Sequence, residues 1–396
     1  MKIGIIGNMN NSYFSLARYL RDEGYDCELL ILANEPVHFD PSCDTFSEDY
    51  SSYCKNVSWG DAGDFLKQDF SLVEKDLAPY QFLIGNGPAP AYVAKVGRIL
   101  DVFIPYGYDI YSLPFFRLVH PIRQLAYASV ARYQRKGIRE SSYILFDRTN
   151  KAFEKVIKKL NYPGQRIVSP APMIYHKDYE NGWHEKTATG PLAVQLKKLR
   201  AESEILLVQH GRQIWKNSAD QWSYKGNNLL VEGYAQFVKE HPLMKIKLVL
   251  FEYGDDVEET KKLVGQLGVE NAVVWMPKMA RNKLMTVLAA SDMIIGELHH
   301  SWLTYGVALE ALCMGKPFMH KRIDSEFSDD YPELYPMLHA FSAQSVYEGL
   351  TTEIKNKSGL KDIGKKGREW FMTYCVNRPV AVIKKMIDEK SSAIHA

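Results

Sequence analysis

The sequence predicts an α/β fold built from two Rossmann-like, doubly wound domains. Short apolar runs alternate with longer amphipathic segments from end to end, a rhythm typical of parallel strands joined by crossover helices. With 396 residues, of which 46% are hydrophobic, the chain is too long for one ordinary domain. A polar stretch over 179–191 interrupts the rhythm and predicts a linker. We therefore expect an N-terminal domain over 1–178, a C-terminal domain over 192–375, and a last helix, 376–396, that packs back on the first domain.

The same pattern locates the individual elements. In the first half we expect strands at 3–6, 27–32, 82–84, 102–104, 143–146 and 166–169, and helices at 13–21 and 150–160. In the second half we expect strands at 205–209, 246–251, 272–275, 293–295 and 317–319, and helices at 228–240, 257–267, 281–289 and 307–314. The tail over 359–390 has the pattern of two basic, amphipathic helices. Two doubly wound sheets that face each other would hold a ligand in a crevice outside the carboxyl ends of their strands.

Composition and charge exclude several classes of protein. Forty-nine Lys and Arg against 47 Asp and Glu give a net charge of +2, which supplies no general basic field for nucleic acid. The five cysteines form no CxxC pair, so neither a zinc cluster nor a disulfide scaffold is indicated. The N-terminal apolar run is too short for a signal peptide, and no stretch approaches the roughly 20 apolar residues of a spanning helix. We expect a cytoplasmic protein with no nucleic-acid partner.

One segment indicates a local anion site. Gly211 and Arg212 come directly after an expected strand, and Lys225 precedes an expected helix. Glycine lets the backbone approach a phosphate, while Arg offers a planar fork and Lys a point charge. We expect both cations to lie at one strand end and to bind a diphosphate. The alternative is that both are solvated loop residues.

A second segment carries a carboxylate on an apolar helix stripe. Glu310 stands between Leu309 and Ala311, where an unpaired charge would be costly. A pair of ribose hydroxyls is a good partner, because an ionised carboxylate can accept both hydrogen bonds. A nearby Lys or a backbone group could satisfy it instead.

The order of these pieces resembles glycosyltransferase family 4, retaining enzymes with the GT-B fold. The segments that carry the resemblance are Gly211-Arg212, Lys225-Gly226, 247–254, 289–295 and 309–317. Together they span essentially the whole second half. In the first half, 4–8 is similar to the family's glycine-bearing first loop, and 169–175 to its exit into the linker.

The resemblance implies two Rossmann-like domains that face each other across a cleft. It implies transfer of a sugar from a nucleotide-diphosphate sugar to a hydroxyl of a glycan or lipid-linked glycan, in surface polysaccharide or glycoconjugate biosynthesis. It also implies a hexosyltransferase that needs no metal and no cofactor beyond the donor itself. Arg212 and Lys225 would bind the diphosphate and act on the leaving group, and Glu310 would bind the ribose. The remaining implied donor residues are Gly211, Gly254 and, for the base, the backbone of Met276, Pro277 and Lys278.

The chain departs from the family where the donor sugar would bind. The family commonly carries a second glutamate eight positions before the ribose-binding one, and Trp302 stands there. Glu297 lies further upstream and is the candidate catalytic replacement. The other candidates for contact with the donor are His299 and the backbone amides of Leu303, Thr304 and Tyr305, which would begin the following helix.

The first half supplies the implied acceptor site. Gly7 and Asn8 belong to the glycine-bearing loop. Tyr106 stands where many relatives carry a histidine near the reacting centre, with Tyr108 and Asp109 close behind it. Asp109 could orient a sugar hydroxyl as a catalytic group, or it could cap a helix or turn.

Residues 111–139 contain several Arg, a Lys and many aromatic or aliphatic side chains but no Asp or Glu. A basic, aromatic amphipathic helix can lie on an anionic bilayer, which would suit a lipid-linked acceptor at the inner face of a membrane. A core-packed helix with a solvated basic face explains the same pattern.

Two alternatives to glycosyl transfer remain open. An epimerase acting on nucleotide sugars would use carboxylates or histidines as proton carriers, and His299 and His300 keep that option. A nucleotide-sugar-binding protein without activity would fit the missing family residues at Tyr106 and Trp302. A metal site at the two histidines is disfavoured because no third ligand stands at a usable spacing. A dehydrogenase is disfavoured because 4–10 does not complete a GxGxxG loop.

Overall fold

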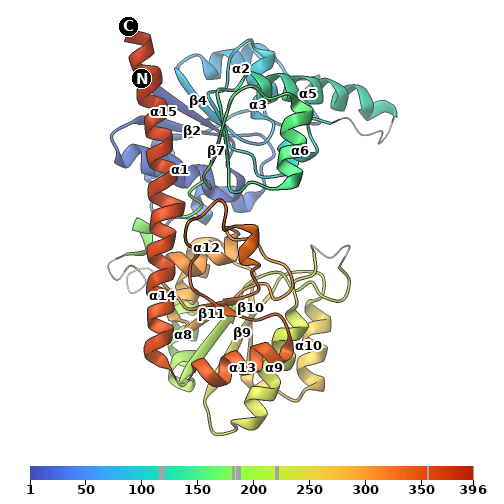
Figure 1. Ribbon diagram of the computed structural model, residues 1–396, viewed down its shortest axis with the longest axis vertical. Coiled ribbons are helices and arrows are strands. Elements are labelled where there is room, and N and C mark those ends of the chain that lie inside the picture. Colours follow the sequence, from blue (N-terminus) through green and yellow to red (C-terminus); the bar gives the residue numbers. More distant parts are fainter. Residues whose placement is uncertain (116–120, 181–182, 184–188, 219–222, 355, 396) are drawn as a thin grey trace. The chain divides into compact units, whose positions relative to one another are not determined.

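The computed structural model describes residues 1–115, 121–180, 183, 189–218, 223–354 and 356–395. They divide into two compact units, one made of Met1–Tyr175 with Thr373–Ala396 and the other of His176–Met372. Each unit contains one parallel sheet, of seven strands in the first and six in the second (Figure 1). The α/β class and the two doubly wound sheets expected from the sequence are confirmed.

In the N-terminal unit the strand order is β3-β2-β1-β4-β5-β6-β7, and all pairs are parallel. The strands are β1 Lys2–Ile6, β2 Asp26–Ile31, β3 Cys54–Asn56, β4 Phe82–Gly85, β5 Val102–Phe103, β6 Tyr143–Phe146 and β7 Gln165–Val168. The order reverses between β1 and β4, which makes that edge a topological switch point. The sequence did not predict β3, because this short edge strand carries polar, exposed residues.

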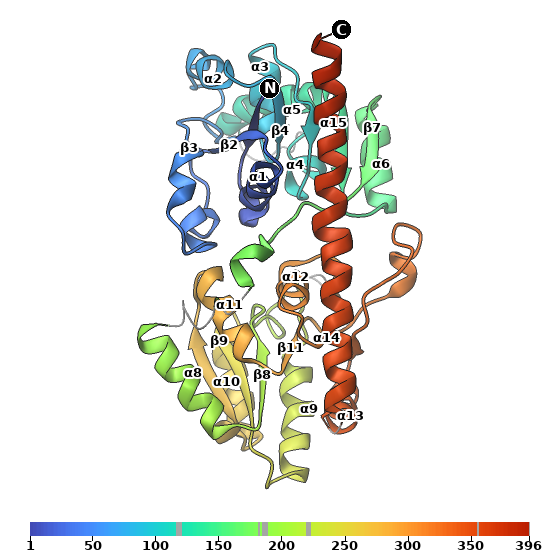
Figure 2. The ribbon, with the colours of Figure 1, turned by 90° about the vertical axis from the view of Figure 1, so that its left-hand side faces the viewer.

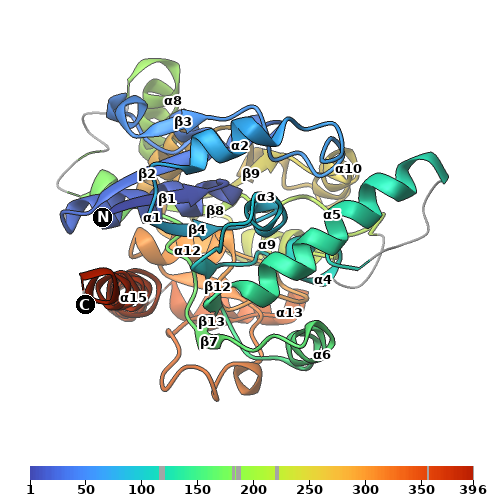
Figure 3. The same ribbon diagram turned by 90° about the horizontal axis from the view of Figure 1, so that it is seen from above.

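The helices of this unit cover both faces of its sheet (Figure 3). They are α1 Ser12–Asp22, α2 Phe70–Leu77, α3 Ala89–Lys95, α4 Tyr108–Tyr111, α5 Pro121–Glu140 and α6 Lys151–Leu160. Buried residues of α1 pack with Ile3 and Ile5 of β1, whereas buried residues of α2, α3, α5 and α6 pack with Ile6 of the same strand. Side chains alternate across a strand, so these two clusters are the two faces of the sheet.

The chain returns to the N-terminal unit through its last helices. α14 Lys357–Phe371 leads through a π-helical turn, Met372–Asn377, into α15 Arg378–His395. Ile383 and Ile387 of α15 join the core cluster of α1, and Lys390 Nζ lies 2.6 Å from Asp101 Oδ1. Figure 2 shows α15 beside α1. The last helix therefore packs on the sheet formed by the first residues of the chain.

In the C-terminal unit the order is β10-β9-β8-β11-β12-β13, again with parallel pairs. The strands are β8 Ile205–Gln209, β9 Ile246–Glu252, β10 Val273–Pro277, β11 Met293–Ile295, β12 Phe318–His320 and β13 Leu338–His339. The helices are α8 Gly190–Glu202, α9 Asn227–Glu240, α10 Val257–Gln266, α11 Arg281–Ala290, α12 Gly306–Cys313 and α13 Ala343–Glu353. The order reverses between β8 and β11, so this sheet also has a switch point.

The stretch over 179–191, expected to be a linker, is partly structured. Its residues 181–182 and 184–188 lie outside the described part of the chain. Before them, a 3-10 helix covers His176–Tyr179, and after them α8 already begins at Gly190. Pro191 fits the first turn of α8, because a proline there gives up no intrahelical hydrogen bond.

Candidate functional site

The candidate donor site lies at the carboxyl edge of the C-terminal sheet. β8 and β11 are hydrogen-bonded neighbours, and the chain leaves them at Gln209 and Ile295. Gly211 and Arg212 follow the first strand, and Glu297 follows the second. The carboxyl ends of parallel strands meet at one edge, and ligands of such folds bind at the switch point. The expected anion-binding and sugar-binding segments are therefore brought together.

An ion pair joins these two segments. Lys225 Nζ lies 2.9 Å from Glu297 Oε1, and both side chains are about one-tenth exposed. The Leu298 N–H also donates to the Lys225 carbonyl at 3.0 Å. Burial raises the pKa of Glu297, although Lys225 and Arg212 act to lower it. In the described structure Glu297 Oε2 is buried without a hydrogen-bond partner, which leaves a strong acceptor at this edge.

Arg212 and Lys225 differ in exposure. Arg212 is exposed and Lys225 is largely buried, yet the charge of Arg212 still acts on the pKa of Glu297. Both cations thus lie near one carboxylate at the end of β8. Their contact with a diphosphate stays a prediction.

The loop after Arg212 is held by one buried carboxylate. Asp256 Oδ2 accepts the backbone N–H groups of residues 215–217 at 2.6, 2.7 and 3.1 Å. Burial acts to raise the pKa of Asp256, but these N–H groups outweigh it and hold that pKa below its ordinary value. Gly254 has φ +113°, and a Cβ there would come within 2.5 Å of the Gln213 backbone. Gly254 is therefore required for the close approach of these two loops.

Glu310 is buried in a three-residue network on α12. Its Oε2 lies 2.7 Å from His210 Nε2, and its Oε1 accepts from Arg281 Nε at 2.9 Å. Burial acts to raise the pKa of Glu310, but His210 and Arg281 outweigh it and hold that pKa below its usual value. The sequence predicted that Glu310 needs a partner but named neither His210 nor Arg281, although each stands directly after a strand or at the start of a helix. Each carboxylate oxygen can accept a second hydrogen bond, so these two partners leave acceptor capacity on Glu310, and its contact with a ribose stays a prediction.

The expected base-binding residues lie at the end of β10. Met276 is fully buried and pairs with Phe251 in the sheet, and its contact with a base stays a prediction. Pro277 is the last residue of the strand and is exposed. Lys278 is exposed, with Nζ 4.6 Å from the centre of the Tyr253 ring.

The segment before α12 differs in detail from the expectation. We expected the amides of Leu303, Thr304 and Tyr305 to begin the helix, but α12 begins at Gly306 with Tyr305 as its N-cap. The Tyr305 hydroxyl instead accepts the Glu297 N–H at 3.1 Å and so fixes the backbone of that residue. His299 packs edge-on against Tyr224, with ring centres 4.7 Å apart, and its pKa is lowered by burial and by Lys321.

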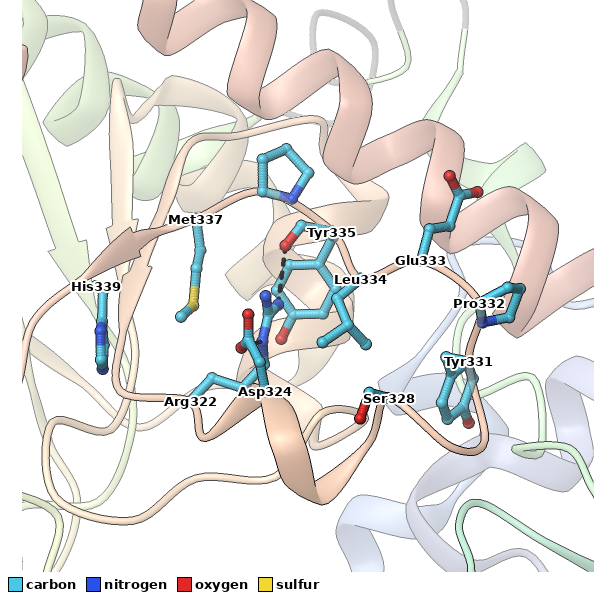
Figure 4. Close-up of a pocket in the computed structure, with 11 residues that line it drawn as sticks. Arg322, Asp324, Ser328, Tyr331, Pro332, Glu333, Leu334, Tyr335, Met337 and His339 are labelled. Atoms are coloured by element: carbon cyan, nitrogen blue, oxygen red, sulfur yellow. Dashed lines mark hydrogen bonds and ion pairs between the residues drawn. The ribbon is translucent and has the colours of Figure 1, made fainter.

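A pocket of this unit, of about 760 Å3, is lined by the segment that joins β12 to β13 (Figure 4). Arg322 lines it but is already engaged: its Nε donates to Asp324 and its Nη1 to the Tyr335 carbonyl, both at 2.8 Å. None of the expected site residues lines this pocket.

The N-terminal unit has a pocket of about 230 Å3 at the carboxyl ends of its strands. Tyr106 and Tyr108, two of the expected acceptor residues, line it and are about half exposed. The other lining residues follow β1, β2, β3 and β4, or precede α5, namely Met9, Leu32, Ala33, Asn34, Glu35, Pro36, Phe39, Gly60, Asp61, Ala62, Asn86, Gly87, Pro88 and Leu113. The pocket therefore includes the switch point between β1 and β4.

Gly7 and Asn8 shape the loop behind this pocket and are not among its lining residues. Gly7 has φ +87°, and a Cβ there would meet the Asn86 amide at 2.9 Å. The buried Asn8 amide donates to the Phe39 carbonyl at 2.6 Å and to Asn11 Oδ1 at 2.7 Å. These two residues hold the first loop, and direct contact with an acceptor stays a prediction.

Asp109 has the contacts of an aspartate that caps a turn, which is the alternative to a catalytic role that the sequence left open. Its carboxylate is fully buried and accepts the N–H groups of Gly87, Tyr106 and Gly107 at 2.9, 3.1 and 3.0 Å. Burial raises the pKa of Asp109 to about 7, although these N–H groups act to lower it. Asp109 thus positions Tyr106 in the pocket wall, and a catalytic role stays a prediction.

Glu35 is a lining residue that the sequence analysis missed. Its Oε1 accepts the Asn8 N–H at 2.8 Å, while its Oε2 is buried without a partner in the described structure. Burial raises the pKa of Glu35 to about 7. Glu35 lies in the loop after β2, which ends at Ile31, and its sequence position alone did not mark it, because its burial comes from packing.

The basic segment over 111–139 is described in part, since 116–120 and the side chains of 121–126 lie outside the described residues. In the rest of α5, Val130 and Ile138 are buried in the core. Gly137 lies so close to α3 that a Cβ would meet the Pro90 carbonyl. This packing favours the core-helix explanation for that part, and membrane contact stays a prediction.

No helix among the described residues is both long and apolar enough to cross a bilayer. No group of three or more His, Cys, Asp or Glu among them could hold a metal ion.

Among known proteins, a glycosyltransferase of an archaeon is related in sequence to part of the chain. No protein-family model matches the chain. An uncharacterized glycosyltransferase of Methanocaldococcus jannaschii is 26% identical over 156 residues, which cover 38% of this chain and 38% of that protein. The match thus spans well under half of the relative's length.

Solved structures match over almost the whole chain. HepE of Anabaena in complex with UDP has a TM-score of 0.62 at 14% identity, covering 99% of this chain and 100% of that one. The trehalose 6-phosphate synthase of Burkholderia multivorans has a TM-score of 0.63 at 12% identity, covering 99% of each chain. A Listeria monocytogenes protein described as a UDP-N-acetylglucosamine 2-epimerase has a TM-score of 0.55 at 13% identity, covering 98% and 97%. The chain therefore has the GT-B fold of two Rossmann-like domains. Within that class, the finer assignment to glycosyltransferase family 4 stays a prediction.

Proposed function

We propose that this protein is a retaining glycosyltransferase of the family 4 type, which moves a sugar from a nucleotide-diphosphate sugar to a hydroxyl of a glycan or lipid-linked glycan. The observation that carries the proposal is the gathering of Arg212, Lys225, Glu297 and the Glu310 network at one carboxyl edge of a GT-B sheet. HepE, which shares the fold, has been solved with UDP and with UDP-glucose.

Departure of the nucleotide is the demanding part of the reaction. Negative charge grows on the distal phosphate as the glycosidic bond breaks, so fixed cations stabilise the transition state more than the ground state. The ion pair with Glu297 fixes the ammonium of Lys225. An ammonium has three donors, so this pair is compatible with a further contact to a phosphate oxygen.

The donor's other parts match the remaining groups. Glu310 is held ionised by His210 and Arg281, and an ionised carboxylate can accept hydrogen bonds from two ribose hydroxyls. The backbone at the end of β10 would meet the base. The buried, unpartnered Oε2 of Glu297 would accept from a hydroxyl of the donor sugar.

Retention is what the family resemblance implies, and because no residue is assigned as a nucleophile, we propose a same-face route. In a same-face route the departing phosphate oxygen takes the acceptor's proton while the acceptor oxygen bonds to the sugar on the face that the nucleotide leaves. Such a route requires no separate general base. It also requires no metal, because the two cations supply the charge at the phosphate.

A thermal-shift panel of nucleoside diphosphates and their sugars tests the donor site. A ligand that binds the folded state raises the melting temperature, and more so at higher concentration or affinity, so one diphosphate should give a selective shift. Glu310→Gln and Lys225→Ala should reduce that shift, whereas Lys239→Ala, on the exposed side of α9, should not. If no diphosphate shifts the wild-type protein, the proposal is wrong.

An epimerase is the second candidate, because the fold is also that of the Listeria epimerase and because His299 lies beside the site. An epimerase would exchange a sugar proton with solvent without any acceptor. Incubation of the donor in deuterium oxide would reveal this by mass spectrometry. Donor binding with neither exchange nor transfer would instead indicate a binding protein.

A further inference from the structure

We propose that the pocket containing Glu35 and Tyr106 is the acceptor subsite and that it takes one uncharged sugar ring, excluding sugar phosphates and other anions. The role of this pocket as an acceptor subsite rests on the proposed function. The binding preference itself can be measured without any transfer.

The position and size of the pocket suit a small ligand. It opens at the carboxyl ends of β1, β2 and β4, at the switch point of the N-terminal sheet. Its volume of about 230 Å3 is below the roughly 300 Å3 at which sites for drug-sized molecules begin. One ring therefore fits better than an oligosaccharide.

Glu35 offers the pocket a hydrogen-bond acceptor that the protein does not use. Its Oε1 is fixed by the Asn8 N–H, and Asn8 is itself locked by its amide contacts to Phe39 and Asn11. Its Oε2 is buried and has no partner in the described structure. A buried acceptor without a partner is costly, and a ligand hydroxyl would remove that cost.

The charge of the lining excludes an anion. The described residues that line the pocket include two acidic residues, Glu35 and Asp61, but no Lys, Arg or His. Asp61 is already engaged, since its carboxylate accepts from the Asn34 amide at 2.8 Å and from the Gly63 N–H at 2.6 Å. A phosphate in this pocket would lose its water without gaining a cation and would lie near two carboxylates.

The remaining walls suit a sugar ring. Tyr106 and Tyr108 present half-exposed aromatic rings, and Leu32, Phe39 and Leu113 add apolar surface. Pockets of this kind combine apolar walls with a few fixed polar groups that orient the ligand. A pyranose offers both an apolar C–H face for the rings and hydroxyls for Glu35.

Saturation-transfer NMR with the full chain tests the preference. The probes are the methyl glycosides of glucose, galactose, mannose and N-acetylglucosamine, compared with glucose 6-phosphate. We expect at least one neutral glycoside to bind and to do so at least tenfold more tightly than glucose 6-phosphate. Equal or tighter binding of glucose 6-phosphate would overturn the proposal, as would the lack of binding by any glycoside at 100 mM.

Variants assign the binding to this pocket. Glu35→Leu should weaken the Kd of the bound glycoside about tenfold or more, because it removes the hydrogen bond that Glu35 accepts from the ligand. Glu35→Gln, which can still accept from Asn8, is the second variant in case the leucine protein does not fold. Glu48→Gln, at an exposed position outside the pocket, is the matched control. An unchanged Kd in a folded Glu35 variant would contradict the assignment.

The nucleotide thermal shift separates this inference from the proposed function. Glu35→Leu should leave that shift unchanged, because Glu35 belongs to the N-terminal unit. Glycoside binding that depends on Glu35, without any nucleotide shift, would refute glycosyl transfer and leave the sugar site standing. A nucleotide shift without a preference for neutral sugars would refute the sugar site and leave the proposed glycosyl transfer standing.

Discussion

The carboxyl edges of the two sheets carry opposite electrostatics. In the C-terminal unit the buried carboxylate of Glu310 lies between His210 and Arg281, and its pKa is below the usual value. In the N-terminal unit the carboxyl of Glu35 meets the neutral Asn8 N–H, and burial raises its pKa to about 7. Burial acts in the same direction on both groups, so the partners decide the sign.

This difference separates two kinds of site on one type of scaffold. Both edges lie at a switch point where strand order reverses, so topology offers each unit a ligand position. The cationic edge suits an anionic leaving group, while the acidic, aromatic edge suits a neutral sugar. Side chains at strand ends, not the sheets themselves, therefore decide which half of a transfer reaction each unit would perform.

Removing one cation from the C-terminal edge should have the largest effect on transfer. Lys225→Ala should lower kcat for transfer by about 100-fold to 1,000-fold, the range seen when one fixed donor is lost from a transition-state charge site. Initial rates of nucleoside diphosphate release with a saturating donor measure this. Lys239→Ala makes the same change of charge on exposed α9 and should keep the wild-type rate. Equal rates for both variants would contradict a role for Lys225.

The Glu310 network predicts a loss of stability that depends on pH. Arg281→Met leaves a buried carboxylate with one partner fewer and should cost about 2 to 3 kcal/mol of unfolding free energy at pH 7. The folded pKa of Glu310 is lowered, so its stabilisation is present above the unfolded pKa of about 4.5 and is lost as pH falls through the folded value. Urea unfolding should therefore show a smaller effect at pH 4 than at pH 7.

The control for this network is Lys283→Met, which changes an exposed charge on the same helix. It should shift the unfolding free energy by less than about 0.5 kcal/mol. An Arg281→Met protein as stable as this control at pH 7 would show that Glu310 does not depend on Arg281.

The N-terminal edge predicts the opposite pH dependence. The folded pKa of Glu35 is raised from 4.5 to about 7, so the native state is favoured below pH 4.5 and loses that advantage as pH rises through 7. Glu35→Gln removes the titration, and its stability relative to wild type should rise by about 1 to 3 kcal/mol between pH 4.5 and 7.5. Asp109 titrates in both proteins and cancels in the difference. If the difference in stability between the two proteins did not change with pH, the pKa of Glu35 would be the same in the folded and unfolded states, as for a solvated carboxyl.

The fold could be predicted because parallel strands buried on both faces give continuous apolar runs. Ile205–Gln209 is buried at every position, and so is Phe82–Gly85. Two strands were not predicted, Cys54–Asn56 and Leu338–His339. Each is only two or three residues long and is partly exposed at a sheet edge. Such strands form through pairing with a neighbour, which a single sequence does not display.

The candidate site could be predicted as a set of positions but not as a set of partners. Arg212 and Glu297 follow strands, and Glu310 lies within a helix, at places that the hydrophobic pattern indicates. His210 and Arg281 reach Glu310 from 100 and 29 residues away, so their pairing depends on tertiary structure. Glu35 was missed because its importance comes from burial behind the loop of Asn8, a property of packing.

The smallest predicted effect tests whether the cationic edge depends on its supporting loop. Asp256→Asn keeps the shape but removes the charge that accepts the N–H groups of residues 215–217. Neutral hydrogen bonds are weaker than charge-assisted ones, so we expect a loss of about 1 kcal/mol of unfolding free energy, measured by urea titration at pH 7. The pKa of Asp256 is lowered in the folded state, so this loss should shrink as pH falls below the unfolded value of 3.8. If the loop positions Arg212, KM for the donor should rise in this variant while Asp255→Asn, an exposed neighbour, leaves it unchanged. An unchanged KM would mean that donor binding by Arg212 does not depend on the hydrogen bonds that Asp256 accepts from the loop.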